Sequence, residues 1–312
     1  MTRRIADCVV RGDFGANPHC QRHIPDCRRE TMREIRRYHP VIADEAVRIF
    51  AGDDKYHDPE VEMFPNIVLP WDLTWIEWKS RPIDEGPKGL RIARKEVREL
   101  YPASEWDYIM NRYVSVGWML SARQHNETKI RTISGMPFWG NGRRPDMEAI
   151  VAEVVTDADG NPLSSEFYNE RWPEGSHQDL WWVAPYEGAY THDQTDLVMY
   201  VAKSFWKCLF VISLLNCKNV TTEYMPVGKK REIEIQKNER VRFSTIKLTD
   251  GQGTSSPRNG THQPPAVHLC RGHFKDYRKN GLGKNHVKGV YWWQQHVRGS
   301  KERGIVHSEH QV

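Results

Sequence analysis

Two runs near the end of the chain, residues 264–274 and 290–299, combine histidine and arginine with apolar and aromatic side chains. Both runs alternate in character and flank a glycine-containing connection, a pattern that predicts a β-hairpin. Alternate residues of a strand share a face, so Arg271 and His273 point one way, and His296 and Arg298 point one way on the other run. If those faces align across the hairpin, two imidazoles and two guanidiniums converge on one anion.

Such a group has the chemistry of a metal-independent ribonuclease. Cleavage needs a base for the 2'-hydroxyl, an acid for the leaving oxygen and a cation for the phosphorane, and histidine and arginine supply these roles. The candidate catalytic residues are His273, His296, Arg271 and Arg298, with no cofactor and no metal. Phosphate binding without catalysis and a purely structural role are open alternatives, so whether the chain is an enzyme stays undecided.

Other side chains on and between the two runs predict contacts with nucleic acid. Trp292 is expected to stack on a base, and the basic side chains are expected to steer a polyanion toward the hairpin. The candidate nucleic-acid-binding residues are His268, Lys275, Tyr277, Arg278, Lys279, Lys284, Lys288 and Trp292.

The charge distribution favours the same kind of partner. The net charge is only +4, yet residues 265–312 hold nine Lys and Arg against three Asp and Glu. Local basic charge of this kind predicts RNA or single-stranded DNA as the partner. All ten basic residues before position 50 are arginines, which suits phosphate pairing, although ion pairs with the acids nearby are the simpler account.

A second group of residues suggests a different chemistry. Asp72 is followed by Glu77 and Lys79 on a strand-like run, an order that occurs in metal-dependent nucleases. Two carboxylates there would hold Mg²⁺, and the lysine would assist the attacking water. This metal-dependent nuclease is the alternative to the hairpin site.

Cysteine and histidine also cluster near the N-terminus. Cys8, Cys20 and Cys27 lie close to His19 and His23 in the sequence, so four zinc ligands are available there. No Cys-x-x-Cys pair is present, although structural zinc sites usually contain one. Zinc binding by this segment is therefore a weaker prediction.

The elements that would position these residues predict an α+β protein. We expect a mostly antiparallel sheet, a buried central helix at about 193–216 and the C-terminal basic hairpin. Leu197, Val201, Phe205, Leu209 and Ile212 mark one face of that helix, and its opposite face is also mostly apolar. Residues 1–125 are expected to form a mainly helical region with one strand at about 66–79, and residues 126–312 an α+β domain.

Residues 104–123 give the clearest amphipathic pattern in the first region. Trp106, Ile109, Met110, Tyr113 and Leu120 follow the spacing of one helix face, and Ser104 is a natural N-cap. The sequence therefore predicts a helix here.

Nothing in the hydropathy predicts a membrane protein. The longest apolar run, 205–215, is interrupted by Lys207 and is too short to span a bilayer, and the N-terminus lacks the apolar core of a signal peptide. We expect a cytoplasmic protein without a membrane partner.

Three segments resemble an uncharacterised family of tailed-phage and prophage proteins. They are the stretch from Leu69 to Trp78, the stretch from Leu214 to Val220, and the run from His268 to Phe274 with the aromatic strand after it. Family members often carry two adjacent arginines before the Gly-His pair, and Cys270 replaces the first of them here. The resemblance implies a phage origin, and so the host cytoplasm, but no activity. It also leaves open a non-enzymatic protein that binds a host or phage protein through exposed aromatic side chains.

Overall fold

The chain is described from a computed structural model. The residues described are 4–16, 27–51, 63–81, 94–95, 98–99, 102–106, 114–125, 128–140, 144–147, 150–163, 181–185, 195–248, 266–270, 272–279, 281, 287–294, 296–298 and 300–305. The chain divides into two compact units. Unit 1 comprises Met1–Asn216 and Thr222–Lys247, and unit 2 comprises Cys217–Thr221 and Leu248–Val312.

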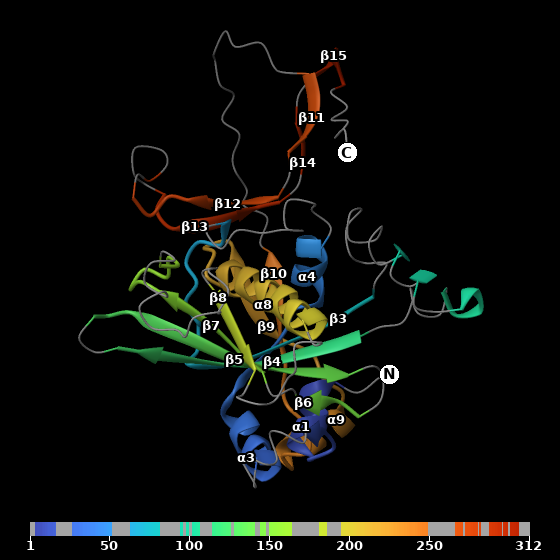
Figure 1. Ribbon diagram of the computed structural model, residues 1–312. Helices are drawn as coiled ribbons and strands as arrows, with labels where there is room; N and C mark the ends of the chain where they lie inside the picture. Colours follow the sequence, from blue (N-terminus) through green and yellow to red (C-terminus); the bar gives the residue numbers. More distant parts are fainter. Residues whose placement is uncertain are drawn as a thin grey trace. The chain divides into compact units, whose positions relative to one another are not determined.

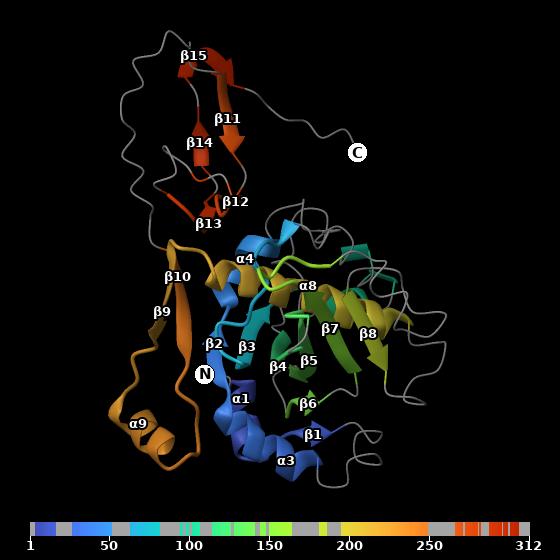
Figure 2. The same ribbon diagram turned by 90° about the vertical axis from the view of Figure 1, so that its left-hand side faces the viewer.

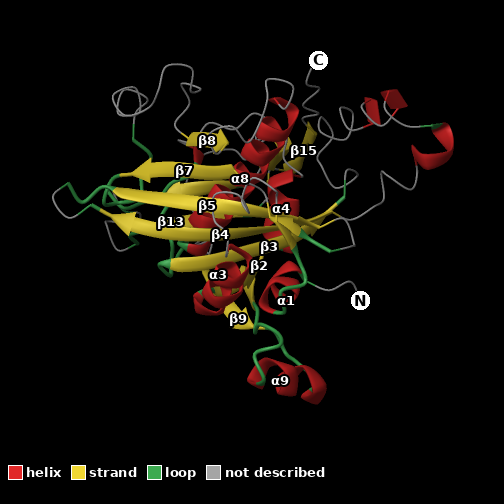
Figure 3. Ribbon diagram, turned by 60° about the horizontal axis from the view of Figure 1, so that its bottom comes forward, coloured by secondary structure: helices red, strands yellow, loops and turns green. Residues whose placement is uncertain are grey.

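A mixed sheet organises unit 1, and within the described residues it has ten strands. Its main order is β1-β6-β5-β4-β3-β2-β10-β9. Off this path, β7 pairs with β5 and β8 pairs with β7; Figure 3 shows β7, β5, β4 and β3 side by side. The pairs β1–β6, β2–β3 and β2–β10 are parallel. The bounds are β1 Gly15–Ala16, β2 His39–Ile42, β3 Leu73–Ser80, β4 Val114–Gln124, β5 Arg131–Gly140, β6 Asp146–Met147, β7 Ile150–Thr156, β8 Trp181–Pro185, β9 Val220–Tyr224 and β10 Ser244–Leu248.

Helices cover both faces of this sheet (Figures 1 and 2). One layer holds α8, Thr195–Leu215, and α4, Asp44–Ala51, with the Phe50 and Phe210 rings 5.3 Å apart. Trp118 of β4 packs on Phe205 of α8 at 5.1 Å. The range of α8 lies within the range predicted for a buried helix, and Val201, Phe205, Cys208, Leu209 and Ile212 are all buried.

The other layer holds α1, Ile5–Val10, and α3, Cys27–Glu34, which continues into the 3₁₀ turn η1, Ile35–Arg37. All six residues of α1 are buried. Phe138 of β5 packs between this layer and the sheet, 6.0 Å from Phe14 and 5.2 Å from Trp75. The second apolar core of unit 1 therefore lies between α1 and the sheet.

The helix predicted over residues 104–123 is wrong from Val114 onward, because Val114–Gln124 forms β4. Before it, Ala103–Glu105 forms the 3₁₀ turn η5, Trp106 is helical, and residues 107–113 lie outside the described residues. Val116, Trp118 and Leu120 alternate onto the face that packs under α8. Pairing with β3 and β5 along most of its length decides the conformation, because long-range pairing outweighs a local helical pattern.

The division expected at residue 125 also differs from the arrangement found. Residue 125 lies between β4 and β5, which are neighbouring antiparallel strands of one sheet, so both sides of that position belong to unit 1. Helices together with a mixed sheet give the α+β class. None of the described helices is both long and apolar enough to cross a membrane.

Gly117 of β4 makes room for the indole of Trp75. A Cβ atom at Gly117 would lie 2.4 Å from Cζ2 of Trp75, which is fully buried. We expect Gly117→Ala to lower the free energy of unfolding by about 1–3 kcal/mol, because the indole has to move within a packed core. The matched control is Gly140→Ala in β5, where the nearest atom would lie 3.6 Å from the new methyl group. Urea denaturation measures both variants, and equal losses would contradict the role of Gly117.

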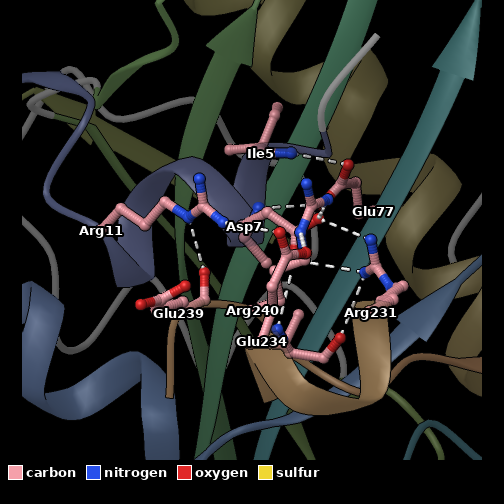
Figure 4. A network of polar contacts seen from close by, with 10 residues as sticks. Ile5, Asp7, Arg11, Glu77, Arg231, Glu234, Glu239 and Arg240 are labelled. Carbon is pink, nitrogen blue, oxygen red and sulfur yellow. Dashed lines mark hydrogen bonds and ion pairs between the residues drawn. The ribbon is translucent and has the colours of Figure 1, made fainter. Parts of the chain in front are cut away.

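The segment between β9 and β10 forms an excursion that carries α9, Lys229–Gln236 (Figure 2). Two side chains of this excursion contact α1: Arg231 and Arg240 both form ion pairs with the buried Asp7 (Figure 4). Met225 N donates to Phe243 O at 2.8 Å and closes the base of the excursion.

The described residues of unit 2 form five further strands. Antiparallel pairs join β11, Ala266–Cys270, to β14, His296–Arg298, and β12, His273–Asp276, to β13, Val290–Trp293. A parallel pair joins β11 to β15, Ser300–Ile305.

Candidate functional site

The register of unit 2 decides which of the predicted site residues come together. His273 pairs with Trp293, Phe274 with Trp292 and Lys275 with Tyr291. In the second ladder His268 pairs with Arg298, and Cys270 pairs with His296. His273 and His296 are therefore not cross-strand partners.

Several of the predicted catalytic and binding residues lie beyond what the structure describes. Arg271 and Lys284 are outside the described residues. The backbones of His268, His296 and Arg298 are described, but their side chains are not. The convergence of His273, His296, Arg271 and Arg298 on one phosphate therefore stays a prediction.

One face of the β12–β13 pair is buried. Phe274 and Trp292 contact each other edge to face, with ring centroids 4.9 Å apart, and Val290 and Trp292 are each 2 % exposed. A Cβ atom at Gly272 would lie 2.7 Å from Cζ2 of Trp292. Asn219 fixes the strand by donating to Trp292 O at 2.7 Å and accepting from Trp292 N at 3.0 Å. The prediction that Trp292 stacks on a base is wrong, because its ring is packed inside unit 2.

The opposite face presents rings and a cation to solvent. It consists of His273, Lys275, Tyr277, Tyr291 and Trp293, and we call it the aromatic-basic face. Lys275 Nζ lies 5.5 Å from the centroid of the Trp293 ring, a cation–π contact, and Trp293 is 41 % exposed. The His273 ring lies 6.2 Å from that of Trp293, and the Tyr277 and Tyr291 rings are 6.0 Å apart. None of the five side chains is acidic.

The basic residues beyond β12 differ in how well they are paired. Arg278 donates to both oxygens of Asp276 at 2.7–3.0 Å, and this contact lowers the pKa of Asp276 below its ordinary value. Arg278 is thus already neutralised in part and offers less charge to a phosphate than predicted. Lys279 and Lys288, in contrast, are exposed near the end of the hairpin.

The geometry of Glu77 contradicts its proposed role in a metal site. Glu77 is fully buried, and its Oε1 accepts from Ile5 N at 2.8 Å. Its Oε2 accepts from Ala6 N at 3.1 Å and from Trp75 Nε1 at 3.2 Å. Glu77 of β3 therefore caps the N-terminus of α1, which packs on the same face of the sheet (Figure 4). Burial raises the pKa of Glu77 to about 7, although these donors oppose the rise.

Asp72 and Lys79, the other members of that proposed metal site, lie in different surroundings from Glu77. Asp72 is exposed just before β3. Lys79 donates its backbone N–H to Asp44 Oδ1 at 2.8 Å, and partial burial lowers the pKa of its ammonium group. Over the residues that the structure describes, no group of three or more His, Cys, Asp or Glu side chains could hold a metal ion.

The N-terminal zinc prediction is only partly covered by the structure. Cys8 is buried within α1. Cys20, His19 and His23 are outside the described residues, as is the side chain of Cys27. Zinc binding there stays a prediction.

The sequence missed a second set of residues, in unit 1. His39, Trp71 and Tyr224 come from distant parts of the chain and border one pocket together with several arginines. No local motif joins them. The excess of arginine before position 50 is the only sequence signal that pointed in this direction.

The comparisons identify no relative on which a function could be based. The sequence matches no protein-family model and no curated protein, and the structure matches no solved structure. The resemblance to tailed-phage proteins stays a prediction, and the geometry of the chain is what its function has to be argued from.

Proposed function

We propose that this protein binds single-stranded nucleic acid, either RNA or single-stranded DNA, through the aromatic-basic face of β12–β13. The observation that carries the proposal is the Lys275 ammonium group 5.5 Å over the half-exposed Trp293 ring. A ring that stacks on a base, beside a cation that meets the neighbouring phosphate, is the usual arrangement in single-strand sites.

The chemistry of the face favours a single strand over a duplex. The rings of Trp293, Tyr277 and Tyr291 can stack only on bases that are themselves unstacked, and a duplex keeps its bases stacked. Basic residues outnumber acidic ones in residues 265–312, which attracts the phosphate backbone over a longer range. His273 has Trp293 rather than a second histidine opposite it, so the geometry supports binding better than it supports cleavage.

Trp293→Ala tests the proposal directly. We expect about tenfold weaker binding of a labelled oligouridine or oligothymidine, because loss of one base–ring stack costs about 1–3 kcal/mol. Fluorescence anisotropy measures the affinity. Ile233→Ala is the matched control, because Ile233 is 51 % exposed on α9 in unit 1 and its truncation should leave the affinity unchanged.

The salt dependence provides an independent measurement. Wild-type affinity should fall steeply with added salt, and Lys275→Ala should reduce the slope of log affinity against log salt by about 0.7. Affinity that is insensitive to salt would favour the alternative of a protein partner. Unchanged affinity in Trp293→Ala would overturn the proposed site.

A further inference from the structure

A pocket of about 590 Å³ opens in unit 1, and none of the described residues that line it belongs to the aromatic-basic face. It lies where the parallel strands β2, β3 and β10 begin and where β9 ends. Its size falls in the range that binds small molecules in proteins. The lining residues used below are His39, Trp71, Tyr224, Arg36, Arg240 and Arg242.

Aromatic rings line part of the pocket. The His39 ring stacks on Trp71 with centroids 3.6 Å apart and planes within 13° of parallel. The Tyr224 ring lies 6.2 Å from that of His39, and Tyr224 is 60 % exposed. His39 Nε2 is 3.1 Å from Ser244 Oγ, which fixes the orientation of the imidazole. Burial lowers the pKa of His39, so the imidazole offers a flat neutral surface near neutral pH.

Guanidinium groups also line the pocket. They belong to Arg36, Arg37, Arg240 and Arg242, and Asp72 is the one acidic residue among the described residues that line it. Arg242 lies 6.0 Å from the Tyr224 ring centroid and pairs with Glu232, which places one guanidinium next to the exposed ring.

Some of these arginines already form an ion pair with a carboxylate. Arg37 pairs with Glu34 at 2.7 Å, and Arg240 pairs with Asp7 and Glu234. Arg36 is exposed and has no ion pair within the described part of the chain. A guanidinium without a carboxylate is the strongest donor that this pocket offers to an anion.

We propose that this pocket binds a free mononucleotide, with its base against Tyr224 and the His39–Trp71 stack and its phosphate on Arg36. The two halves of the ligand match the two kinds of side chain that line the pocket, aromatic rings and guanidiniums. An inorganic anion would use the guanidiniums and leave the rings uncovered, whereas a nucleoside would use the rings and leave Arg36 without an anion. This site is separate from the proposed single-strand site in unit 2.

Isothermal titration calorimetry of the full chain with AMP, UMP, adenosine, uridine and inorganic phosphate tests the match. We expect at least one of the two mononucleotides to bind roughly tenfold or more tightly than its own nucleoside and than phosphate, since a charge-assisted contact and a stack each contribute more than 1 kcal/mol. Phosphate binding as tightly as both mononucleotides, or no heat with either mononucleotide, would overturn the proposal.

Two exposed side chains allow each half of the site to be removed without disturbing the core. Arg36→Ala should weaken mononucleotide binding about tenfold and leave nucleoside binding unchanged, whereas Tyr224→Ala should weaken both. Arg33→Ala is the matched control, because its side chain is 73 % exposed on α3 and does not line the pocket. Thermal unfolding checks that each variant is folded.

Crossed variants separate this proposal from the single-strand site. Trp293→Ala should leave AMP binding unchanged, and Tyr224→Ala should leave oligouridine binding unchanged. If Trp293→Ala weakened AMP binding and Arg36→Ala did not, the mononucleotide would belong to the aromatic-basic face and the pocket proposal would be wrong.

Discussion

Asp7→Asn should lower the free energy of unfolding by about 3–5 kcal/mol, which is the usual cost of removing one partner from a buried ion pair. Asp7 is 1 % exposed and lies between two guanidiniums (Figure 4). Its Oδ2 accepts from Arg231 Nη1 and from Arg240 Nη1, both at 3.1 Å. Its Oδ1 accepts from Arg231 Nη2 and from Val241 N, both at 3.2 Å. An amide keeps the shape but loses the charge and leaves two partly buried cations short of a partner.

The loss should be concentrated in the β9–α9–β10 excursion. Asp7 joins α1 to α9 and to the residues before β10, so the amide protons of α9 should exchange with solvent faster in Asp7→Asn than in the wild type. Asp72→Asn is the control, because Asp72 is exposed and its change should cost less than about 0.5 kcal/mol. A double-mutant cycle between Asp7 and Arg231 that gives no coupling energy would contradict the role assigned to the ion pair.

The parts of the fold that the sequence predicted are those set by local pattern. The strand predicted at about 66–79 forms only from Leu73, as β3, Leu73–Ser80, where β-branched and aromatic residues fill the run. The nearly continuous apolar pattern of residues 193–216 predicted a helix, and α8 forms there. The helix prediction failed for the residues of β4, because the apolar positions there, such as Trp118 and Leu120, fit the period of a strand as well as that of a helix. Only the pairing with β3 and β5 decides between the two conformations.

The candidate sites were harder to predict, because they depend on contacts between residues that are far apart in the sequence. Alternation predicted paired strands around His273, but it did not show which of Trp292 and Trp293 is buried. That choice depends on Asn219, which is 73 residues away in the sequence. Glu77 was predicted as a metal ligand, whereas it accepts a hydrogen bond from Ile5 N at the start of α1. The two residues are 72 positions apart in the sequence, so no local pattern indicates this contact. The pocket around His39 and Tyr224 exists only once β2 and β10 pair.

Titration of Glu77 should make the protein less stable as pH rises from about 4.5 to about 7. Burial raises the folded-state pKa to about 7 from an ordinary value of 4.5, so the folded state holds a proton that the unfolded state has released over this interval. The free energy of unfolding therefore falls with rising pH, and the contribution of this group is about 3 kcal/mol once both pKa values are passed. The stabilising effect of the proton is fully present below pH 4.5.

The comparison of wild type with Glu77→Gln isolates this titration, because the amide does not ionise. The amide will itself cost stability, since its NH₂ group cannot accept from Ile5 N or Ala6 N, but that cost is the same at every pH. We expect the stability advantage of the wild type, measured by urea denaturation, to shrink between pH 4.5 and pH 7 and then level off. Glu45→Gln is the control, because Glu45 is 69 % exposed beside Arg48 and its difference from wild type should stay small throughout. A difference for Glu77→Gln that does not change with pH would mean that the N–H donors of Ile5, Ala6 and Trp75 offset the effect of burial, so that the pKa of Glu77 is not raised on folding.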